Sequence, residues 1–211
     1  MRPLLIVLSS PSGTGKTTLV ERLLAARSDI GRSVSATTRA PRDGEIDGRD
    51  YHFLTRAVFG KKERAGEFLE SATYGGNRYG TLRSEVKRLH ANGSHALLVI
   101  EVGGARKVRR RFRGAVEIFL LPPSGEELIR RLGARRTEAA GVLAKRLTIA
   151  KRELSAVGEY DYLIVNDQLE EAVRDVSAIV DAEVCRVSRQ SDLSTRVTRL
   201  RREIAAATQK Q

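Results

Sequence analysis

The 211-residue sequence has one cysteine and no long apolar segment. Cys185 has no second cysteine to pair with, so an internal disulfide is excluded, as is typical of a reducing compartment. We expect this thiol to be half-buried in a helix. The apolar run near the N-terminus is shorter than the hydrophobic part of a signal peptide. No run approaches the ~20 apolar residues of a membrane-spanning helix, so we expect a cytoplasmic protein without a membrane partner.

Acidic residues are scarce relative to basic ones. The 26 Asp and Glu residues stand against 38 Lys and Arg residues, which leaves a net charge of +12. This excess predicts an anionic partner but does not distinguish nucleic acid, nucleotide and lipid. The densest basic run, residues 106–113, contains one aromatic residue, Phe112, and no RNA-binding signature. We interpret it as a solvated helix end and expect no specific nucleic-acid partner.

Metal-ligating and nucleophilic constellations are also missing. The three histidines, His52, His90 and His95, do not have the spacing of zinc ligands, and we expect each at the surface or in a loop. The lone cysteine lies far from any histidine in the sequence, and no Ser–His–Asp arrangement is suggested. These absences argue against a zinc site and against a nucleophile activated by histidine.

What the sequence does contain is a series of short apolar runs separated by helical patterns. The first, residues 4–9, is continuous and is followed by small residues, which is typical of a strand buried on both faces. Leu19, Leu23 and Leu24 follow it at helical spacing. Further strands are predicted at residues 95–102, 116–121 and 162–165. Because helical patterns follow these strands, the sequence predicts an α/β fold with a parallel sheet covered by helices on both faces.

Two of the predicted helices have recognisable limits. Ser124 and Glu127 have the spacing of a capping box at a helix N-terminus. After the last strand, the helical pattern extends over residues 169–188. The pairing of strand and helix therefore continues to the C-terminal part of the chain.

Two segments do not fit this alternation. Residues 33–92 are rich in glycine, aromatic residues and short alternating runs, and we expect an inserted α+β subdomain. Residues 133–141 combine weak apolar periodicity with clustered charge, and we expect a mobile cover. Both would lie at the carboxyl ends of the strands, where ligands bind in open parallel sheets. We expect a single domain, residues 1–211, with a core at 1–32, 93–132 and 147–211, an insert at 33–92 and a lid at 133–146.

The segment SPSGTGKT, residues 10–17, lies between the first strand and the first helix. Gly13, Gly15, Lys16 and Thr17 match the P-loop pattern, whereas Ser10 stands where that pattern has its first glycine. Small residues allow backbone N–H groups to surround phosphate oxygens, and the helix N-terminus adds further donors. Lys16 would reach the β- and γ-phosphates, and the Thr17 hydroxyl would bind Mg²⁺. An ordinary glycine-rich turn is the alternative, which the strand–loop–helix context disfavours.

A charged segment with an aromatic end, TTRAPRDGEIDGRDYHFL, occupies residues 37–54. Together with PSGTGKTTL before it, EFLE and NRYGT after it, and YDYLIVND further along the chain, it resembles the guanylate kinase family in order and spacing. The resemblance covers nearly the whole chain. It implies ATP:GMP phosphotransfer that uses Mg²⁺ and gives ADP and GDP, with dGMP as a further acceptor, in purine nucleotide metabolism and GMP recycling. It also implies a core, a GMP-binding region and a lid.

The resemblance assigns a role to particular residues of the insert at 33–92 and to Glu101 of the core. It implies that the GMP phosphate is held by Arg39, Arg42, Tyr51 and Tyr79, and the guanine base by Ser35, Glu70, Thr81 and Glu101. The chemistry of these side chains agrees, because arginine binds phosphate oxygens with two parallel hydrogen bonds. A carboxylate such as Glu70 accepts from guanine N1 and N2 and would repel adenine N1, and a hydroxyl such as Ser35 or Thr81 can donate to O6. The alternative for the two arginines is surface ion pairs with Glu45 or Asp47.

Catalysis of phosphoryl transfer needs positive charge and positioning more than covalent help. The resemblance implies that Lys16, Arg135 and Arg146 supply that charge; Arg136 occupies a position that is usually glycine in the family and is interpreted as solvated. Asn166 is expected on the adenine side. The expected ATP-binding residues are Ser10, Pro11, Ser12, Gly13, Thr14, Gly15, Lys16, Thr17 and Asn166.

The sequence departs from the family at the end of one strand. Two acids separated by one residue are usual there, but this chain has Val99 followed by Glu101. Strand alternation predicts that both side chains lie on one face. Either Glu101 serves both purposes, or Mg²⁺ is held by Thr17, phosphate oxygens and water, which is acceptable because Mg²⁺ often takes few protein ligands.

Three other functions are compatible with parts of the sequence. A non-catalytic domain of this family could bind proteins at the former GMP site, but such domains usually lack the P-loop lysine that Lys16 provides here. The net charge of +12 could attract nucleic acid without specificity. A P-loop kinase for another small acceptor would leave Glu70 and Ser35 without a guanine to bind.

Overall fold

The structure is a computed structural model that describes residues 2–133 and 140–208. Its larger sheet has five parallel strands in the order β2-β7-β1-β8-β9. β1 (Leu5–Ser9) is central, with Leu5 beside Ala96 of β7 (His95–Val99) and Ile6 beside Val116 of β8 (Val116–Leu121). β2 (Ile30–Arg32) and β9 (Tyr162–Val165) are the outer strands. The continuous apolar runs of β1, β7 and β8 form strands that are covered on both faces, whereas the outer strand β9 leaves Leu163 and Val165 51% and 49% exposed.

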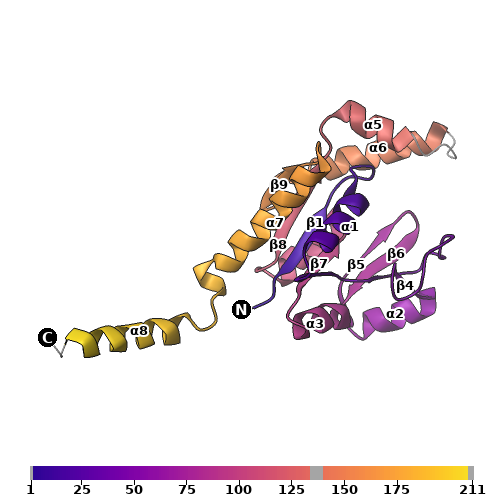
Figure 1. The fold of residues 1–211 in the computed structure, drawn as a ribbon. Coiled ribbons are helices and arrows are strands. Elements are labelled where there is room, and N and C mark those ends of the chain that lie inside the picture. Colours follow the sequence, from indigo (N-terminus) through magenta and orange to yellow (C-terminus); the bar gives the residue numbers. More distant parts are fainter. Residues whose placement is uncertain (1, 134–139, 209–211) are drawn as a thin grey trace.

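Helices pack on each face of this sheet (Figure 1). On one face, α1 (Lys16–Ala26) and α7 (Leu169–Cys185) contribute Leu19, Leu23 and Val176 to a core with Ile6 and Leu8. On the other face, α3 (Arg83–Ala91) and α4 (Val102–Arg111) contribute buried leucine and valine side chains to a second core. α5 (Gly125–Gly133) and α6 (Ala140–Leu154) pack together near the carboxyl end of β1. The predicted parallel sheet with helices on both faces is confirmed.

A second sheet is formed by the segment between β2 and α3. It has four strands in the order β4-β3-β6-β5, with β3 (Ser35–Thr37) antiparallel to β6 (Asn77–Leu82). β4 (His52–Phe53) is parallel to β3, and β5 (Phe68–Tyr74) is antiparallel to β6. α2 (Arg56–Arg64) covers it, and the Phe59 ring stacks on Phe68 at 4.4 Å. α3 packs instead on the larger sheet through Val86 and Leu89, although the expected insert ends after it.

Most strand limits agree with the sequence, and the exceptions have local causes. β8 and β9 have the predicted ends, but β7 stops at Val99 because the chain turns there to start α4 at Val102. α7 ends at Cys185 rather than residue 188, where a 3-10 helix, Val187–Arg189, replaces it. Ser124 Oγ accepts from Glu127 N at 3.1 Å, as a cap should. The Glu127 carboxylate pairs with arginines of the same helix instead of completing the box.

Several expectations about single side chains were wrong. Cys185 is exposed at the last turn of α7. His95 is buried, and its Nδ1 accepts from Leu4 N at 2.9 Å; burial lowers the pKa of this imidazole. The basic run of α4 is not simply solvated, since Arg106 and Arg109 form ion pairs with Glu159, which follows α6 in a 3-10 helix, Val157–Glu159. Among the described residues, no helix is long and apolar enough to cross a membrane.

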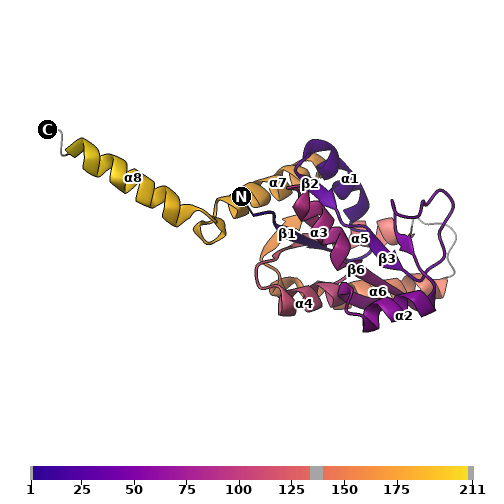
Figure 2. The same ribbon diagram turned by 90° about the horizontal axis from the view of Figure 1, so that it is seen from below.

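The last helix does not belong to either core. α8 (Leu193–Thr208) extends away from the two sheets, as both views of the ribbon show (Figures 1 and 2). Every residue of this helix is exposed. No residue of α8 lies near the candidate site (Figures 1 and 2).

Candidate active site

The loop of residues 10–17 joins the carboxyl end of β1 to the N-terminus of α1. Gly13 and Gly15 have φ values of 89° and 90°, in the left-handed region. A Cβ atom would lie 2.8 Å from Leu132 Cδ2 at the first position and 2.7 Å from Asn166 Nδ2 at the second. Both positions therefore require glycine. The turn directs the loop into a helix N-terminus, whose first N–H groups have no intrahelical partner and can bind phosphate.

Side chains inside the loop hold its shape. Thr14 Oγ1 donates to Pro11 O at 2.8 Å, and Ser10 Oγ donates to the same carbonyl at 3.1 Å. Ser10, which stands where the P-loop pattern has glycine, is buried, so its side chain does not project from the loop into solvent. Lys16 and Thr17 are the first two residues of α1; Lys16 Nζ lies 3.5 Å from Ser10 O, and Thr17 is exposed.

Three side chains from neighbouring elements, one amide and two guanidinium groups, form hydrogen bonds with the loop. Asn166 Nδ2 donates to Thr14 O at 2.7 Å, and Arg131 Nη1 donates to the same carbonyl at 3.1 Å. Arg146 Nη2 donates to Ser12 Oγ at 3.1 Å. Arg146 therefore lies beside the phosphate loop. Sequence reasoning missed Arg131, because its spacing of four residues from Glu127 is that of an ordinary surface ion pair.

Asn166 has two relationships to the loop. It is buried beneath Thr14, and it also lines a cavity of about 310 Å³ together with Gly15, Arg131 and Asp167. Because its amide N–H donates to the carbonyl of Thr14, Asn166 stabilises the shape of the loop. That Asn166 lies on the adenine side stays a prediction, and this cavity is the space beside it.

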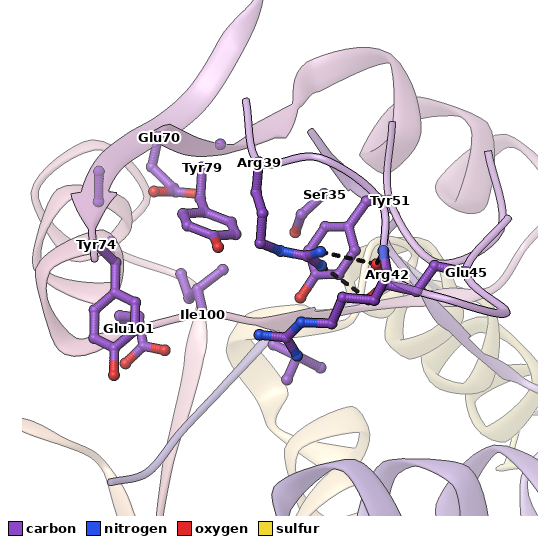
Figure 3. Close-up of a pocket in the computed structure, with 14 residues that line it drawn as sticks. Ser35, Arg39, Arg42, Glu45, Tyr51, Glu70, Tyr74, Tyr79, Ile100 and Glu101 are labelled. Atoms are coloured by element: carbon purple, nitrogen blue, oxygen red, sulfur yellow. Dashed lines mark hydrogen bonds and ion pairs between the residues drawn. The ribbon is translucent and has the colours of Figure 1, made fainter. Parts of the chain in front are cut away.

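A second cavity, of about 220 Å³, opens beside the smaller sheet (Figure 3). We call it the Glu70 cavity. It contains seven of the eight residues expected to bind GMP, which come from β3, β5, β6, the loop before β4 and the segment after β7. Those that line it are Ser35, Arg39, Arg42, Tyr51, Glu70, Tyr79 and Glu101. Three adjacent strands therefore bring together residues that are far apart in the sequence.

Thr81, the eighth residue, does not line this cavity but contacts Glu70. Its backbone N donates to Glu70 Oε1 at 3.0 Å, and its Oγ1 donates to the same oxygen at 2.8 Å. Glu70 and Thr81 are direct partners across β5 and β6, and Ser35 is opposite Thr81 on β3. Burial raises the pKa of Glu70, whereas the two Thr81 hydrogen bonds lower it. The Thr81 hydroxyl thus donates to Glu70 in this structure, and the expected donation to guanine O6 by Ser35 or Thr81 stays a prediction.

Gly104 of α4 leaves room for this carboxylate. A Cβ atom at residue 104 would lie 2.7 Å from Glu70 Oε2. The close approach requires the absence of a side chain, since carboxylate and methyl groups cannot overlap. Gly104 was not identified from the sequence, because only the packing of α4 on β5 makes it necessary.

The arginines at the other end of the cavity differ in their partners. Arg39 forms a bidentate pair with Glu45, with Nη1–Oε2 at 2.9 Å and Nη2–Oε1 at 2.8 Å (Figure 3). Its guanidinium lies 5.3 Å from the centre of the Tyr51 ring. Within the described residues, the Arg42 guanidinium makes no hydrogen bond or ion pair. The ion-pair alternative is therefore correct for Arg39 in this ligand-free chain and incorrect for Arg42.

A buried carboxylate links the cavity to the phosphate loop. Glu153 of α6 is 8% exposed, and among the described residues nothing donates to its Oε2. Burial and the neighbouring Glu101 carboxylate raise the pKa of Glu153, and the nearby Lys16 ammonium lowers it. Glu101 and Glu153 also line one further cavity with Tyr74. Sequence reasoning missed Glu153 because its helix has the charged composition of a solvated surface.

Two other expectations are resolved differently. Val99 and Glu101 both line the Glu70 cavity, but Glu101 lies beyond the strand, at the N-terminal end of α4. Strand alternation therefore does not relate the two side chains. The cover expected at residues 133–141 falls largely outside the described residues, and Arg135 and Arg136 lie outside them entirely.

The fold and the two sites define a class of protein. A P-loop at the carboxyl end of a parallel strand, beside a cavity lined by arginine, tyrosine and carboxylate, is the arrangement of a P-loop kinase that phosphorylates a small acceptor. The family model described as guanylate kinase matches residues 2–183.

Known proteins similar to this chain agree with that class. A guanylate kinase of Nitrosospira multiformis is 46% identical over 186 residues, 88% of this chain and 89% of that protein. One from Clostridium perfringens strain SM101 is 46% identical over 188 residues, 89% and 87% of the two chains. The crystal structure of guanylate kinase from Anaplasma phagocytophilum has a TM-score of 0.77 at 38% identity and covers 92% of this chain and 93% of that one. The chain belongs to the guanylate kinase family, the nucleoside monophosphate kinases that transfer phosphate from ATP to GMP.

Proposed function

We propose that the Glu70 cavity binds GMP and that residues 10–17 bind the phosphates of ATP. The observation that carries this assignment is a pair of carboxylates between the two sites. Glu101 lines the Glu70 cavity, and the neighbouring Glu153 is close enough to Lys16 for the ammonium charge to lower the pKa of Glu153. An acceptor in the cavity and a donor on the loop would then meet at one edge of the parallel sheet. That proximity converts a bimolecular transfer into a step within one complex.

The phosphate of GMP would bind at the arginine end of the cavity. Arg42 has a guanidinium without a hydrogen-bond partner among the described residues, and the Tyr51 and Tyr79 rings are 6.1 Å apart beside it. Arg39 is engaged by Glu45, so a phosphate would share or replace that carboxylate. A dianionic phosphate competes well, because it offers an additional charge and further acceptor oxygens.

The guanine base would bind at the Glu70 end. Thr81 occupies Glu70 Oε1 with two donors, which leaves Oε2 to accept from guanine N1–H or N2–H. Glu101 is a second acceptor on the wall of the same cavity. Adenine would present an unprotonated N1 to these carboxylates and be repelled. Ser35 is the hydroxyl that remains to donate to guanine O6.

The reaction itself would be assisted by positive charge. A phosphate oxygen of GMP attacks the γ-phosphorus of ATP, and the bond to the leaving ADP oxygen breaks. Lys16 at the start of α1 and Arg146 beside Ser12 would neutralise charge on the transferring group. Arg135, which is outside the described residues, is proposed as a further cation on the basis of the family resemblance.

The residues around the loop are compatible with Mg²⁺. Thr17 offers an exposed hydroxyl next to Lys16, and no group of three metal-binding side chains occurs among the described residues. A hard cation with few protein ligands fits this donor set, since Mg²⁺ retains water and takes phosphate oxygens as ligands. When bound, Mg²⁺ would neutralise charge on the β- and γ-phosphates. We therefore propose Mg²⁺-dependent activity.

One assay with several acceptors tests this function. ATP consumption is measured with GMP, dGMP, AMP, UMP and CMP at equal concentrations, with and without Mg²⁺. We expect turnover with GMP and dGMP, little with AMP, and none with the pyrimidine nucleotides or without Mg²⁺. Equal rates for AMP and GMP would contradict the base-recognition role of Glu70. Binding of GMP without any turnover would indicate a non-catalytic binding domain.

The biological setting is proposed from the same activity. An ATP:GMP phosphotransferase converts recycled or newly made GMP to GDP, which places it in purine nucleotide metabolism. The cytoplasm is the compartment that holds both substrates and agrees with a single exposed thiol at Cys185. The charge of +12 is proposed to attract nucleotides rather than a specific nucleic acid.

A further inference from the structure

α8 carries an apolar stripe that nothing in the described chain covers. Leu193, Val197, Leu200 and Ile204 are 37%, 43%, 47% and 67% exposed. The helix lies beyond residues 2–183, where the family model matches, and it projects from the body (Figure 2). An exposed row of large aliphatic side chains on a separate helix is typical of an interaction surface. The ATP:GMP phosphotransfer reaction does not require this helix.

The spacing of the stripe is that of a coiled coil. The four residues are separated by four, three and four positions, which continues as a repeat of seven residues. In heptad notation Val197 and Ile204 occupy positions a, whereas Leu193 and Leu200 occupy positions d. A stripe confined to positions a and d is as narrow as the seam of a coiled coil. The fitting occupant of the stripe is therefore a second helix of the same kind.

The charged residues beside the stripe favour another copy of this chain in a particular orientation. Arg196 and Glu203 occupy positions g, and Arg201 occupies position e. In an antiparallel pair, positions g face each other, so Arg196 would meet Glu203 of the partner subunit, and the reverse. In a parallel pair, Arg196 would meet Arg201 of the partner subunit and be repelled.

We propose that α8 is a self-association element that forms an antiparallel two-stranded coiled coil with α8 of a second copy. The stripe has four large residues per helix, and helices this short are marginal in isolation. The association is accordingly weak and depends on concentration. An anionic lipid surface is the main competitor, because α8 also carries Arg199 and Arg202 on its polar face. The stripe, however, is purely aliphatic and lacks the aromatic residues that commonly anchor helices in lipid headgroups.

Sedimentation equilibrium of the full chain at several concentrations tests the proposal. We expect a monomer–dimer equilibrium, and Leu200→Glu should raise the dimer dissociation constant at least about tenfold, because it places a charge in the interface. The matched control is Ala206→Glu, which adds the same charge at position c on the opposite side of the helix and should leave the equilibrium unchanged. ATP:GMP turnover per chain should be equal in both variants, which verifies that the body is folded.

Charge exchange tests the orientation. Arg196→Glu should weaken the dimer if the helices are antiparallel, and Arg196→Glu combined with Glu203→Arg should restore it. A stronger dimer for Arg196→Glu alone would show a parallel pair and overturn the proposed arrangement. A chain that is monomeric at every concentration, or a Leu200→Glu variant that dimerises like the wild type, would overturn self-association. Co-sedimentation of a monomeric chain with phosphatidylserine-containing vesicles, but not with neutral ones, would assign the stripe to lipid.

Discussion

Thr81 places two donors on one oxygen of Glu70: its backbone N lies 3.0 Å from Oε1 and its hydroxyl lies 2.8 Å from it. Both residues are buried, at 0% and 3% exposure. The arrangement fixes the orientation of the carboxylate and leaves Oε2 as the only oxygen whose acceptor positions are not directed at Thr81. In the proposed function, selectivity for guanine depends on this oxygen, which the protein itself holds in place.

Glu70→Gln should weaken the use of GMP without affecting ATP. The amide oxygen can keep the two Thr81 donors, which forces the NH₂ group toward the base, where guanine also presents donors. We expect kcat/KM for GMP to fall by about 1–3 kcal/mol in free-energy terms, with the KM for ATP unchanged. Steady-state kinetics with each substrate varied in turn measures this. Equal losses for both substrates would show that Glu70 has a purely structural role.

Gly104→Ala should have a similar effect through packing alone. The added Cβ would lie 2.7 Å from Glu70 Oε2, so the carboxylate has to move away from its Thr81-bound position. A displacement of this kind should reduce kcat/KM for GMP on the order of 10–100-fold. Gly103→Ala is the matched control, since a Cβ there meets nothing within 4 Å on the same helix. If the two variants behave alike, the close approach has no functional meaning.

Lys16→Ala should remove most of the turnover and leave GMP binding intact. Lys16 begins α1 at the phosphate loop, whereas the Glu70 cavity does not include it. Loss of one cation that meets the transferring phosphoryl group should lower kcat by at least about 100-fold. Calorimetric titration with GMP in the absence of ATP supplies the second readout. A variant that retains wild-type kcat would show that the loop does not bind the reacting phosphates.

Glu153→Gln should make stability less sensitive to pH. The pKa of Glu153 is raised above its ordinary value of 4.5, so the folded chain retains a proton that the unfolded chain has released. The free energy of unfolding therefore falls as the pH rises above 4.5, until the folded-state carboxyl ionises as well. Removing this group should reduce that loss by on the order of 1–3 kcal/mol between about pH 5 and pH 8.

Denaturant unfolding at a series of pH values measures the effect of Glu153→Gln. Glu126→Gln serves as the control, because Glu126 is exposed on the neighbouring helix α5. The wild type and the control should lose stability with rising pH in parallel, and the Glu153→Gln curve should be flatter. Three parallel curves would mean that Glu153 ionises in the folded chain as it does in the unfolded one.

The parts of this fold that the sequence predicts are those set by local patterns. β8 has the predicted ends because a strand covered on both faces forms a continuous apolar run, and β9 has them as well although one of its faces is partly exposed. The phosphate loop is predictable because its glycines, lysine and threonine are contiguous. The residues of the Glu70 cavity were predicted from a resemblance in motif order, since no local pattern places Ser35 of β3 and Glu70 of β5 on either side of Thr81 in β6.

The missed residues depend on contacts between distant segments. Glu153 lies in a helix whose composition is that of a surface, and only the packing of α6 near the phosphate loop buries it. His95 is buried because a backbone N–H from Leu4 reaches its ring nitrogen, 91 positions away in the sequence. Gly104 is required only by the position of Glu70 Oε2. Burial and pairing of polar groups are tertiary properties, and periodicity carries little information about them.

Val99→Asp should lower the Mg²⁺ concentration needed for half-maximal rate. Val99 is beside Leu8 in the sheet, packs with the core on the α1 side and lines the Glu70 cavity, so a carboxylate there would lie near the start of the phosphate loop. With only Thr17 proposed as a protein ligand, the metal depends on phosphate oxygens and water, and an added anion nearby should strengthen its binding.

Turnover at saturating ATP and GMP is titrated with Mg²⁺ for Val99→Asp and for Val99→Asn, which has the same shape without the charge. We expect the aspartate curve alone to shift to lower Mg²⁺ by about two- to tenfold, the range of a modest charge interaction. Superimposable curves for all three chains would mean that Val99 only packs in the sheet and that the metal does not sense this position.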